Sequence, residues 1–262
     1  MERRQALGAA LAVAASGSAR AQGRTQKPVV LVHGAGHGGW CWRDVRKNLQ
    51  GRGFDVFTPT LTGLGDRVHL RSPDIGLSTH ITDVVNLIEF EELKDVVLVG
   101  HSYAGMVVTG VCDALRNRIA HMIIIDGAVP EDGEPSFPGG TRETLRQRFG
   151  EFKDGYLISM NVAGLGFPDP SSPMAKWLAS HLTEHLVKTW TDTISLKNGG
   201  SNGIPRTYIQ CGDPAKMAPT GQAKIAKVKN DPAWTYIEKI GPHNLMNSDP
   251  TWTANLIAST AA

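Results

Sequence analysis

Cysteine is scarce in this chain of 262 residues. Cys41, Cys112 and Cys211 form an odd set, and their spacing fits no metal-binding motif. A chain of this length does not depend on disulfides for its core, so we predict three buried, free thiols. Internal repeats and low-complexity blocks are also missing. With 41% hydrophobic and 20% charged residues, the composition favours one large domain, or one domain with an insertion.

The chain also has little excess of charge of either sign. Lys and Arg number 27 against 25 Asp and Glu, which gives a net charge of +2. Arg3, Arg4 and Arg20, set against Glu2, supply that whole excess. A mature chain without them is close to neutral. The sequence therefore gives no reason to expect a nucleic-acid partner or an anionic membrane surface.

The sequence also contains no apolar run long enough to span a bilayer. The apolar stretch at residues 6–15 is too short for a stable anchor, so we expect no membrane anchor. It follows Arg3-Arg4 and precedes the small residues around Ala21, a pattern typical of an export signal. We predict a signal peptide over residues 1–21 and a periplasmic or secreted protein. The alternative is a frayed N-terminal helix on a cytoplasmic enzyme, and the choice between the general and twin-arginine routes stays open.

Short β-branched runs alternate with helical stretches along most of the chain. Continuous apolar runs indicate strands covered on both faces, and therefore a mostly parallel sheet of about six strands with helices on both faces. We assign residues 22–128 and 205–262 to this α/β core. Helices are expected over residues 79–91 and 102–117. The runs that predict strands lie at residues 29–32, 56–57, 96–99, 122–125, 207–209 and 235–237.

The alternation breaks over residues 129–204. Several Pro and Gly residues lie there among short helical patterns that no strand separates. The alternative is a long disordered loop, but the segment is too apolar for that. We therefore predict a helical cap inserted after the fourth parallel strand. Its large apolar side chains include Phe149, Phe152, Tyr156, Trp177 and Trp190.

The strongest catalytic signal is Gly-His-Ser-Tyr-Ala-Gly at residues 100–105. It follows an apolar strand and opens a helix, which is the arrangement of a nucleophile elbow, so Ser102 is the predicted nucleophile. Ala104 replaces the usual final Gly and is small enough to keep the turn. The pattern Gly-x-Ser-x-Gly also occurs around Ser201. We interpret Ser201 as a loop residue, because no strand precedes it and no helix follows.

A second glycine-rich turn follows the first strand at residues 33–39. An acyl-transfer enzyme of this architecture places an oxyanion-hole donor there. We predict the backbone N–H groups of Ala35 and Tyr103 as the two donors. A phosphate-binding loop is the alternative, but the segment lacks both the dinucleotide fingerprint and the P-loop Lys.

Of nine histidines, His243 is the one placed as a general base, between the last predicted strand and the C-terminal helix. His101 is expected to be structural, because neighbouring side chains in a turn diverge. His181, Glu184 and His185 form a His-x-x-Glu-His pattern that zinc enzymes use. With no third ligand apparent, we interpret them as solvated polar residues on a cap helix and predict no metal site.

Two carboxylates compete for the acid position. Asp213 follows the penultimate strand, the commoner location, but it lies beside Pro214 in a polar turn. Asp126 ends an apolar strand, where an unpaired carboxylate is costly to bury, and His243 would be its partner. We favour Asp126 and keep Asp213 as the alternative.

Taken together, these segments resemble the plant methylesterases, the salicylate-binding esterase and the α-hydroxynitrile lyases within the α/β-hydrolase superfamily. The resemblance rests on residues 33–40, 61–67 and 100–106 and extends through Thr79-His80, residues 129–133 and residues 206–209. It implies an α/β-hydrolase fold with a cap.

Departures from the lyases favour an esterase. The resemblance implies that lyases carry Thr after the first-strand His and Lys after the catalytic His, where this chain has Gly34 and Asn244. The family's usual acid would fall at or near Pro214, which leaves the choice of acid open. Some haloalkane dehalogenases carry their acid where this chain has Asp126.

The sequence therefore predicts a serine hydrolase that cleaves small hydrophobic or aromatic carboxylic esters through an acyl-enzyme. The chemistry requires neither a metal nor an organic cofactor. The alternatives are a hydroxynitrile lyase-like enzyme and a non-catalytic receptor for a small ligand. The expected partner is a small-molecule ester, and the oligomeric state stays open, with a homodimer among the states allowed.

Overall fold

The computed structural model describes residues 26–262 except 138, 166, 168 and 217–218. Its centre is a six-stranded sheet in the order β2-β1-β3-β4-β7-β8, in which every pair of neighbours is parallel. The predicted sheet of about six strands is confirmed. Its strands are β1 (Val29–Val32), β2 (Val56–Phe57), β3 (Val96–His101), β4 (Ile119–Ile125), β7 (Arg206–Gln210) and β8 (Trp234–Glu238).

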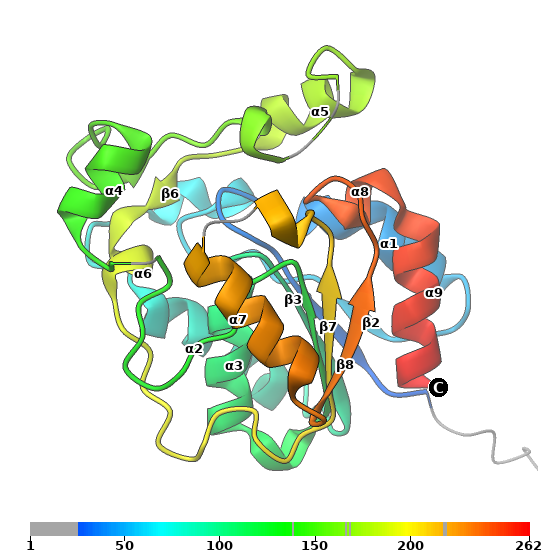
Figure 1. Cartoon of the computed structure of the whole chain (residues 1–262). Helices are drawn as coiled ribbons and strands as arrows, with labels where there is room; N and C mark the ends of the chain where they lie inside the picture. Colours follow the sequence, from blue (N-terminus) through cyan, green and yellow to red (C-terminus); the bar gives the residue numbers. More distant parts are fainter. Residues whose placement is uncertain (1–25, 138, 166, 168, 217–218) are drawn as a thin grey trace, which may run out of the picture.

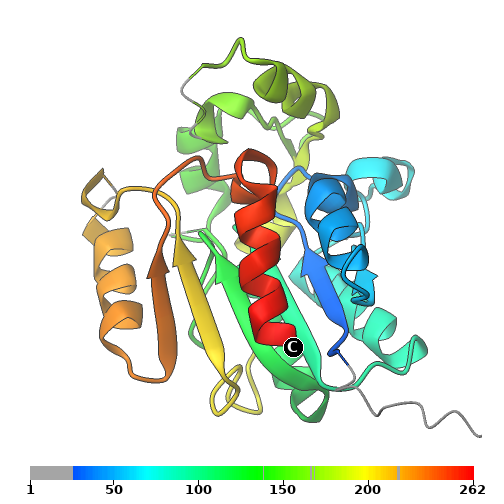
Figure 2. The same ribbon diagram turned by 90° about the vertical axis from the view of Figure 1, so that its right-hand side faces the viewer.

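Helices cover both faces of the sheet, as Figures 1 and 2 show. The two faces follow from the alternation of side chains along each strand. In β3, Val97 and Val99 pack in the core beneath α1 and α9, while Val96 and Leu98 pack in the core beneath α2, α3 and α7. The covering helices are α1 (Arg43–Gln50), α2 (Leu77–Phe90), α3 (Ala104–Ala114), α7 (Pro219–Asn230), α8 (Leu245–Ser248) and α9 (Pro250–Ala261).

The predicted helices are present but differ at their ends. The helix expected over residues 79–91 is α2, which begins two residues earlier, where Gly76 is extended and serves as N-cap. The helix expected over 102–117 is α3, followed by a separate 3₁₀ turn at Arg116–Arg118. Ser102 has a positive φ and so lies outside α3. Further 3₁₀ turns are Gly39–Trp42, Gly65–Leu70, Val162–Leu165 and Pro214–Lys216.

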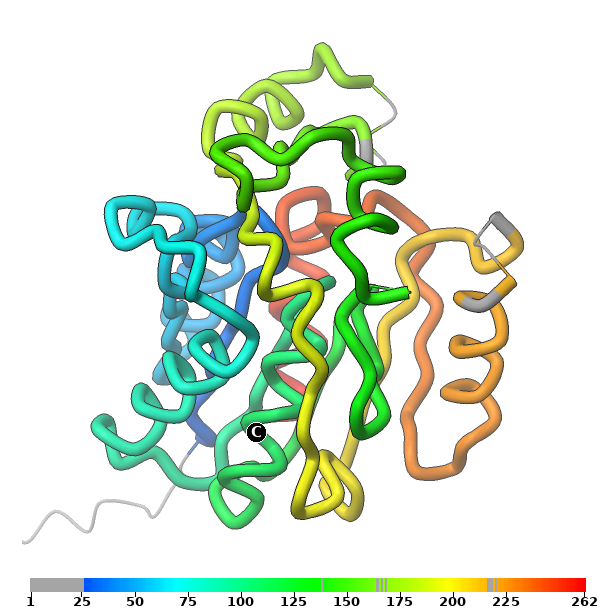
Figure 3. The backbone as a smooth tube through the Cα atoms, turned by 90° about the vertical axis from the view of Figure 1, so that its left-hand side faces the viewer, coloured from blue at the N-terminus to red at the C-terminus, as the bar shows by residue number. Residues whose placement is uncertain are grey.

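Between β4 and β7 the chain leaves the sheet and passes over its carboxyl edge, at the top of Figures 1 and 3. This segment was expected to contain helices without strands, and that expectation is wrong in one respect. Two strands of two residues each, β5 (Leu157–Ile158) and β6 (His185–Leu186), pair antiparallel. Runs this short carry no periodicity that a sequence could reveal. The helices are α4 (Arg142–Phe149), α5 (Pro173–His181) and α6 (Val187–Thr191).

The cysteine prediction is confirmed, since Cys41, Cys112 and Cys211 are free and buried. Burial raises the pKa of each thiol above its usual value. Within the described residues, no helix is long and apolar enough to cross a membrane. The signal peptide predicted at residues 1–21 lies outside the described residues.

Candidate active site

Ser102 stands directly after β3, in the turn that leads into α3. Its φ is +56°, in the left-handed region that side chains other than glycine rarely adopt. Its N–H donates to the carbonyl of Ile125 at the end of β4 (3.0 Å), and its own carbonyl accepts from Gly105 (3.0 Å). The surrounding hydrogen bonds hold this strained turn in place, as strained residues at functional sites require.

Two glycines let the backbone close around this turn. A Cβ on Gly105 would lie 2.0 Å from the carbonyl oxygen of Ala128. A Cβ on Gly127 would lie 2.6 Å from the carbonyl oxygen of Ser102. The first turn of α3 therefore packs directly on the loop that follows β4. This contact sets the Ser102 turn beside the one at Asp126.

Asp126 follows β4 as Ser102 follows β3. The preceding residues, His101 and Ile125, are register partners, so the two turns are neighbours at the carboxyl edge of the sheet. Asp126 also has a positive φ, +45°. Its carboxylate accepts from His243 Nδ1 at 2.6 Å, and from Gln210 Nε2 (3.1 Å) and the Cys211 N–H (3.3 Å). The strand-end carboxylate thus has His243 as a hydrogen-bond partner.

The other candidate acid lies in a different environment. Asp213 is exposed, and its carboxylate accepts from the N–H of Ala215 in its own turn (3.0 Å). The loop that leads into β7 (yellow, at the bottom of Figure 3) lies at the edge of the sheet opposite to the carboxyl edge, and Ser201 belongs to this loop because it precedes β7 in the sequence. There it lies 3.5 Å from Arg206 Nη1, and the residues on either side form turns.

The loop that carries His243 is fixed from both sides. His101 Nε2 donates to the carbonyl of His243 at 2.9 Å, and the two imidazole rings are 4.6 Å apart. From the cap segment, the carbonyl of Leu165 accepts the N–H of His243 at 3.0 Å. His101 is fully buried and holds His243 through its backbone carbonyl, which agrees with the structural role expected for His101.

The glycine-rich turn after β1 lies against Ser102. A Cβ on Gly34 would lie 3.0 Å from Ser102 Cβ and 2.8 Å from His101 Nδ1. Buried histidines hold this turn by its carbonyls: His33 Nδ1 donates to Gly34 (2.9 Å), and His37 Nδ1 donates to Ala35 (2.7 Å). Since the N–H and C=O of one peptide point in opposite directions, fixing the Gly34 carbonyl also fixes the direction of the Ala35 N–H.

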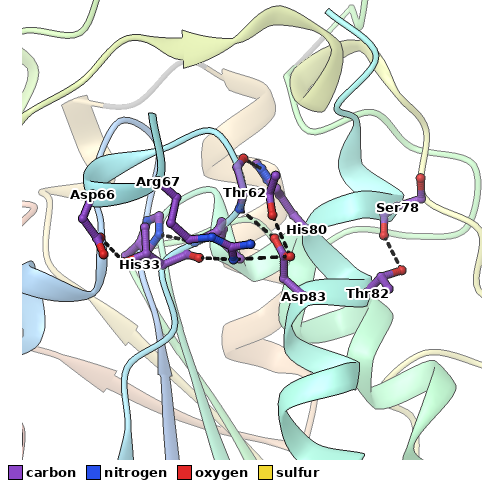
Figure 4. Close-up of polar contacts among 10 residues, drawn as sticks. His33, Thr62, Asp66, Arg67, Ser78, His80, Thr82 and Asp83 are labelled. Atoms are coloured by element: carbon purple, nitrogen blue, oxygen red, sulfur yellow. Dashed lines mark hydrogen bonds and ion pairs between the residues drawn. The ribbon is translucent and has the colours of Figure 1, made fainter. Parts of the chain in front are cut away.

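The N–H groups of Ala35 and Tyr103 both border this turn. In the part of the chain that the structure describes, neither donates a hydrogen bond. The Tyr103 side chain is anchored, because its hydroxyl donates to His80 Nδ1 at 2.9 Å, while His80 Nε2 donates to the carbonyl of Thr62. Thr62 is held in turn by Asp83, through its N–H at 2.7 Å and its hydroxyl at 2.8 Å (Figure 4).

His181, Glu184 and His185, the three residues of the His-x-x-Glu-His pattern, lie in different environments. His181 is exposed at the end of α5 and packs on Trp177. Glu184 forms ion pairs with Arg71 (2.8 Å) and Lys153. His185 was expected to be solvated on a helix, and this is wrong: it is fully buried in β6. Its apolar neighbours Leu186 and Val187 were the available sequence signal. Among the described residues, no group of three or more His, Cys, Asp or Glu is arranged to hold a metal.

Comparison with known proteins agrees with this architecture. The model of the alpha/beta hydrolase family matches residues 29–256. A carbendazim hydrolyzing esterase from Nocardioides sp. (strain SG-4G) is 34% identical over 240 residues, covering 88% of this chain and 98% of that protein. Methylesterase 9 of Arabidopsis thaliana is 29% identical, covering 71% of this chain and 80% of its own.

Solved structures show the same fold. An extracellular alpha/beta-hydrolase from a Paenibacillus species, described as sharing homology with tobacco salicylic acid binding protein 2, superposes with a TM-score of 0.74. It is 22% identical, covering 90% of this chain and 99% of its own. The chain belongs to the α/β-hydrolase family. It is an enzyme of the carboxylic ester hydrolase class.

The buried histidines around the site are neutral at ordinary pH. Burial lowers the pKa of His33 to about 3 and those of His37 and His80 to about 4. The pKa values of His101 and His185 are also lowered by burial, well below 6.5. Each of these side chains would take up a proton on unfolding at mildly acidic pH.

This difference predicts strong acid sensitivity. Between the folded pKa values and about 6.5 the unfolded chain binds more protons, so stability falls as the pH drops below about 6.5. Lowering the pH from 7 to 5.5 costs about 1 kcal/mol for each of the five histidines, hence about 5 kcal/mol in the free energy of unfolding. Urea denaturation at the two pH values measures it. Equal free energies of unfolding at pH 7 and 5.5 would contradict the neutral buried state. Between pH 7 and 8.5 these histidines should contribute almost nothing to any change in the free energy of unfolding.

Proposed function

We propose that Ser102, His243 and Asp126 form the catalytic triad of this esterase. The hydrogen bond of 2.6 Å between His243 Nδ1 and the Asp126 carboxylate carries the proposal. It orients the imidazole with Nδ1 occupied and Nε2 left to exchange a proton. The elbow at Ser102 and the close approach of Gly34 to it support the assignment of the nucleophile.

The reaction proceeds by two acyl transfers. His243 accepts the Ser102 proton as Oγ attacks the ester carbonyl, and the N–H groups of Ala35 and Tyr103 hold the oxyanion. His243 then protonates the departing alcohol, which leaves an acyl-enzyme. Water attacks that ester with the same base and oxyanion hole, and Ser102 regains its proton. Asp126 keeps the imidazole in the required tautomer and stabilises the imidazolium.

The substrates proposed are small hydrophobic or aromatic carboxylic esters. The cap residue beside the glycine-rich turn is apolar: a Cβ on Gly36 would lie 2.6 Å from Met160 Cγ. Behind Tyr103, the buried rings of His185 (centroid 4.8 Å from that of Tyr103) and Trp190 (centroid 5.1 Å from that of His185) form an aromatic cluster. The polar atoms of His185 and Thr189 are used in hydrogen bonds with each other, with Gly36 and with Leu186, which leaves them little capacity to bind a charged or strongly polar substrate. The names of the relatives, esterases and methylesterases, support ester substrates.

Two contacts favour hydrolysis over lyase chemistry. A side chain at position 34 would collide with His101 and Ser102, so the Thr associated with the lyases has no space there. Asn244 is fully buried, and its amide donates to His37 Nε2 at 2.8 Å. No ammonium group therefore follows His243 to stabilise a departing cyanide.

We also propose that residues 1–21 direct export. The charged start, the short apolar stretch and the small residues at Ala19 and Ala21 support it. Expression of the full chain in a bacterial host should yield periplasmic or secreted protein whose first residue is Gln22. Mass spectrometry of the N-terminal peptide measures this. Cytoplasmic protein that keeps the first 21 residues would contradict the proposal.

The nucleophile can be tested with one substitution. Ser102→Ala should abolish hydrolysis of p-nitrophenyl butyrate and phenylacetate while the circular dichroism spectrum stays unchanged, because the hydroxyl contributes little packing. A fluorophosphonate should label Ser102 in the wild type, as peptide mass mapping would show. Ser201→Ala is the matched control and should keep full labelling. Label recovered on Ser201 would overturn the elbow assignment.

The acid is tested by a matched pair of variants. Asp126→Asn should lower kcat by about 10⁴, as a triad Asp→Asn change does when it leaves the imidazole in the wrong tautomer. Asp213→Asn should cost less than about tenfold, because that carboxylate is exposed and caps its own turn. Circular dichroism of both variants controls for folding. The reverse ranking of the two losses would assign the acid to Asp213.

A further inference from the structure

His185 is a buried side chain of the cap segment whose hydrogen bonds define its tautomer. Its Nε2 lies 2.8 Å from Thr189 Oγ1, and the Thr189 hydroxyl donates to the carbonyl of Leu186 at 2.8 Å. The hydroxyl proton is therefore used, and His185 Nε2 must be the donor to Thr189. Its Nδ1 is then an acceptor, and it accepts the N–H of Gly36 at 3.2 Å. Burial lowers the pKa of His185 well below 6.5, which keeps Nδ1 unprotonated.

The Gly36 N–H belongs to the peptide that follows Ala35. The carbonyl of that peptide accepts from His37 Nδ1 at 2.7 Å, and His185 holds its other end. The next carbonyl, that of Gly36, accepts from the N–H of Thr183 at 2.8 Å. The cap segment thus holds two consecutive peptides of the glycine-rich turn. Gly36 has a φ of +69°, which glycine adopts without strain, and a Cβ there would lie 2.7 Å from the carbonyl oxygen of Thr183.

The same imidazole contacts the other half of the proposed oxyanion hole. The His185 ring packs edge-on against the ring of Tyr103, with the centroids 4.8 Å apart. His80 holds the Tyr103 hydroxyl from the far side. One side chain therefore contacts Tyr103 and the peptide group that follows Ala35, next to both N–H groups proposed as oxyanion donors.

An ion pair and hydrogen bonds attach the segment that carries His185 to the α/β core. Glu184 forms an ion pair with Arg71 at 2.8 Å, and Arg71 also donates to the carbonyls of Gly63 (3.1 Å) and Glu184 (3.2 Å). These bonds fix β6 against the loop between β2 and α2. His185 therefore reaches Gly36 from a support with little freedom to shift, as a residue that positions catalytic groups must.

We propose that His185 is a positioning residue of the oxyanion hole, through which the cap aligns the N–H groups of Ala35 and Tyr103. The inference rests on the proposed function of those two groups. Losing one oxyanion donor lowers kcat by about 10²–10³ in serine hydrolases. Misaligning a donor costs less than losing it, so we expect an effect of about 10- to 100-fold. The effect should fall on kcat, because the oxyanion forms only in the transition state.

A matched pair of substitutions tests the role of Nδ1. In His185→Asn the amide oxygen replaces Nδ1 as acceptor for Gly36, whereas in His185→Gln the polar group reaches the position of Nε2. His185→Asn should keep kcat within about tenfold of the wild type. His185→Gln and His185→Leu should lose about 10- to 100-fold in kcat with KM within about threefold. His181→Leu, the exposed residue of the same sequence pattern, is the control and should leave both constants unchanged.

Active-site titration with a fluorophosphonate to its end point gives kcat per functional site, which separates misalignment from partial unfolding. A trifluoromethyl ketone, which forms a tetrahedral oxyanion on the serine, should bind more weakly to each variant by the factor lost in kcat. Equal kcat per titrated site in the Asn, Gln and wild-type enzymes would overturn the proposal. So would a rise in KM alone, which would assign His185 to substrate binding. A wrong assignment of the catalytic triad would be recognised by a different result, because the Ser102→Ala variant would then retain activity.

Discussion

The site depends on two left-handed turns at the ends of adjacent strands. Ser102 and Asp126 have φ values of +56° and +45°, which cost free energy for residues other than glycine. Close packing supports both turns, since Gly105 and Gly127 let α3 and the loop after β4 touch through their backbones. Since β3 and β4 are in register at His101 and Ile125, the two turns set Ser102 and the Asp126 carboxylate side by side. The remaining site residues are arranged around this pair.

Neutral buried imidazoles are the second constraint. His33, His37 and His185 each hold one peptide group of the turn after β1, while His80 anchors the Tyr103 side chain and His101 anchors the backbone of His243. An imidazole can donate at one nitrogen and accept at the other, which suits it to joining backbone groups in a dry interior. Because burial also lowers the pKa values of these imidazoles, we expect the fold to lose stability in acid.

The sequence predicted those features of the fold that are determined by local residue patterns. Apolar runs revealed the parallel sheet, and the strand–turn–helix context distinguished Ser102 from Ser201 although only the latter fits the full motif. For the acid, the sequence offered two strand ends and favoured Asp126, but it kept Asp213 open because the choice depends on which carboxylate reaches His243 in space. The burial of His185 was missed because its contact with Gly36 is distant in sequence, and because the local signal, its apolar neighbours Leu186 and Val187, was outweighed by the zinc-like His-x-x-Glu-His pattern. The strands of the cap were missed because two-residue strands have no period.

We propose that Ser102 faces an oxyanion hole formed by the N–H groups of Ala35 and Tyr103, while Asp126 holds His243. A crystal structure of the enzyme inactivated by a fluorophosphonate would reveal this arrangement. We expect phosphorus bonded to Ser102 Oγ, with the phosphonyl oxygen about 2.7–3.1 Å from both N–H groups. His243 Nδ1 should keep its bond to Asp126. A phosphonyl oxygen turned away from both N–H groups, or an adduct on another residue, would rule this arrangement out.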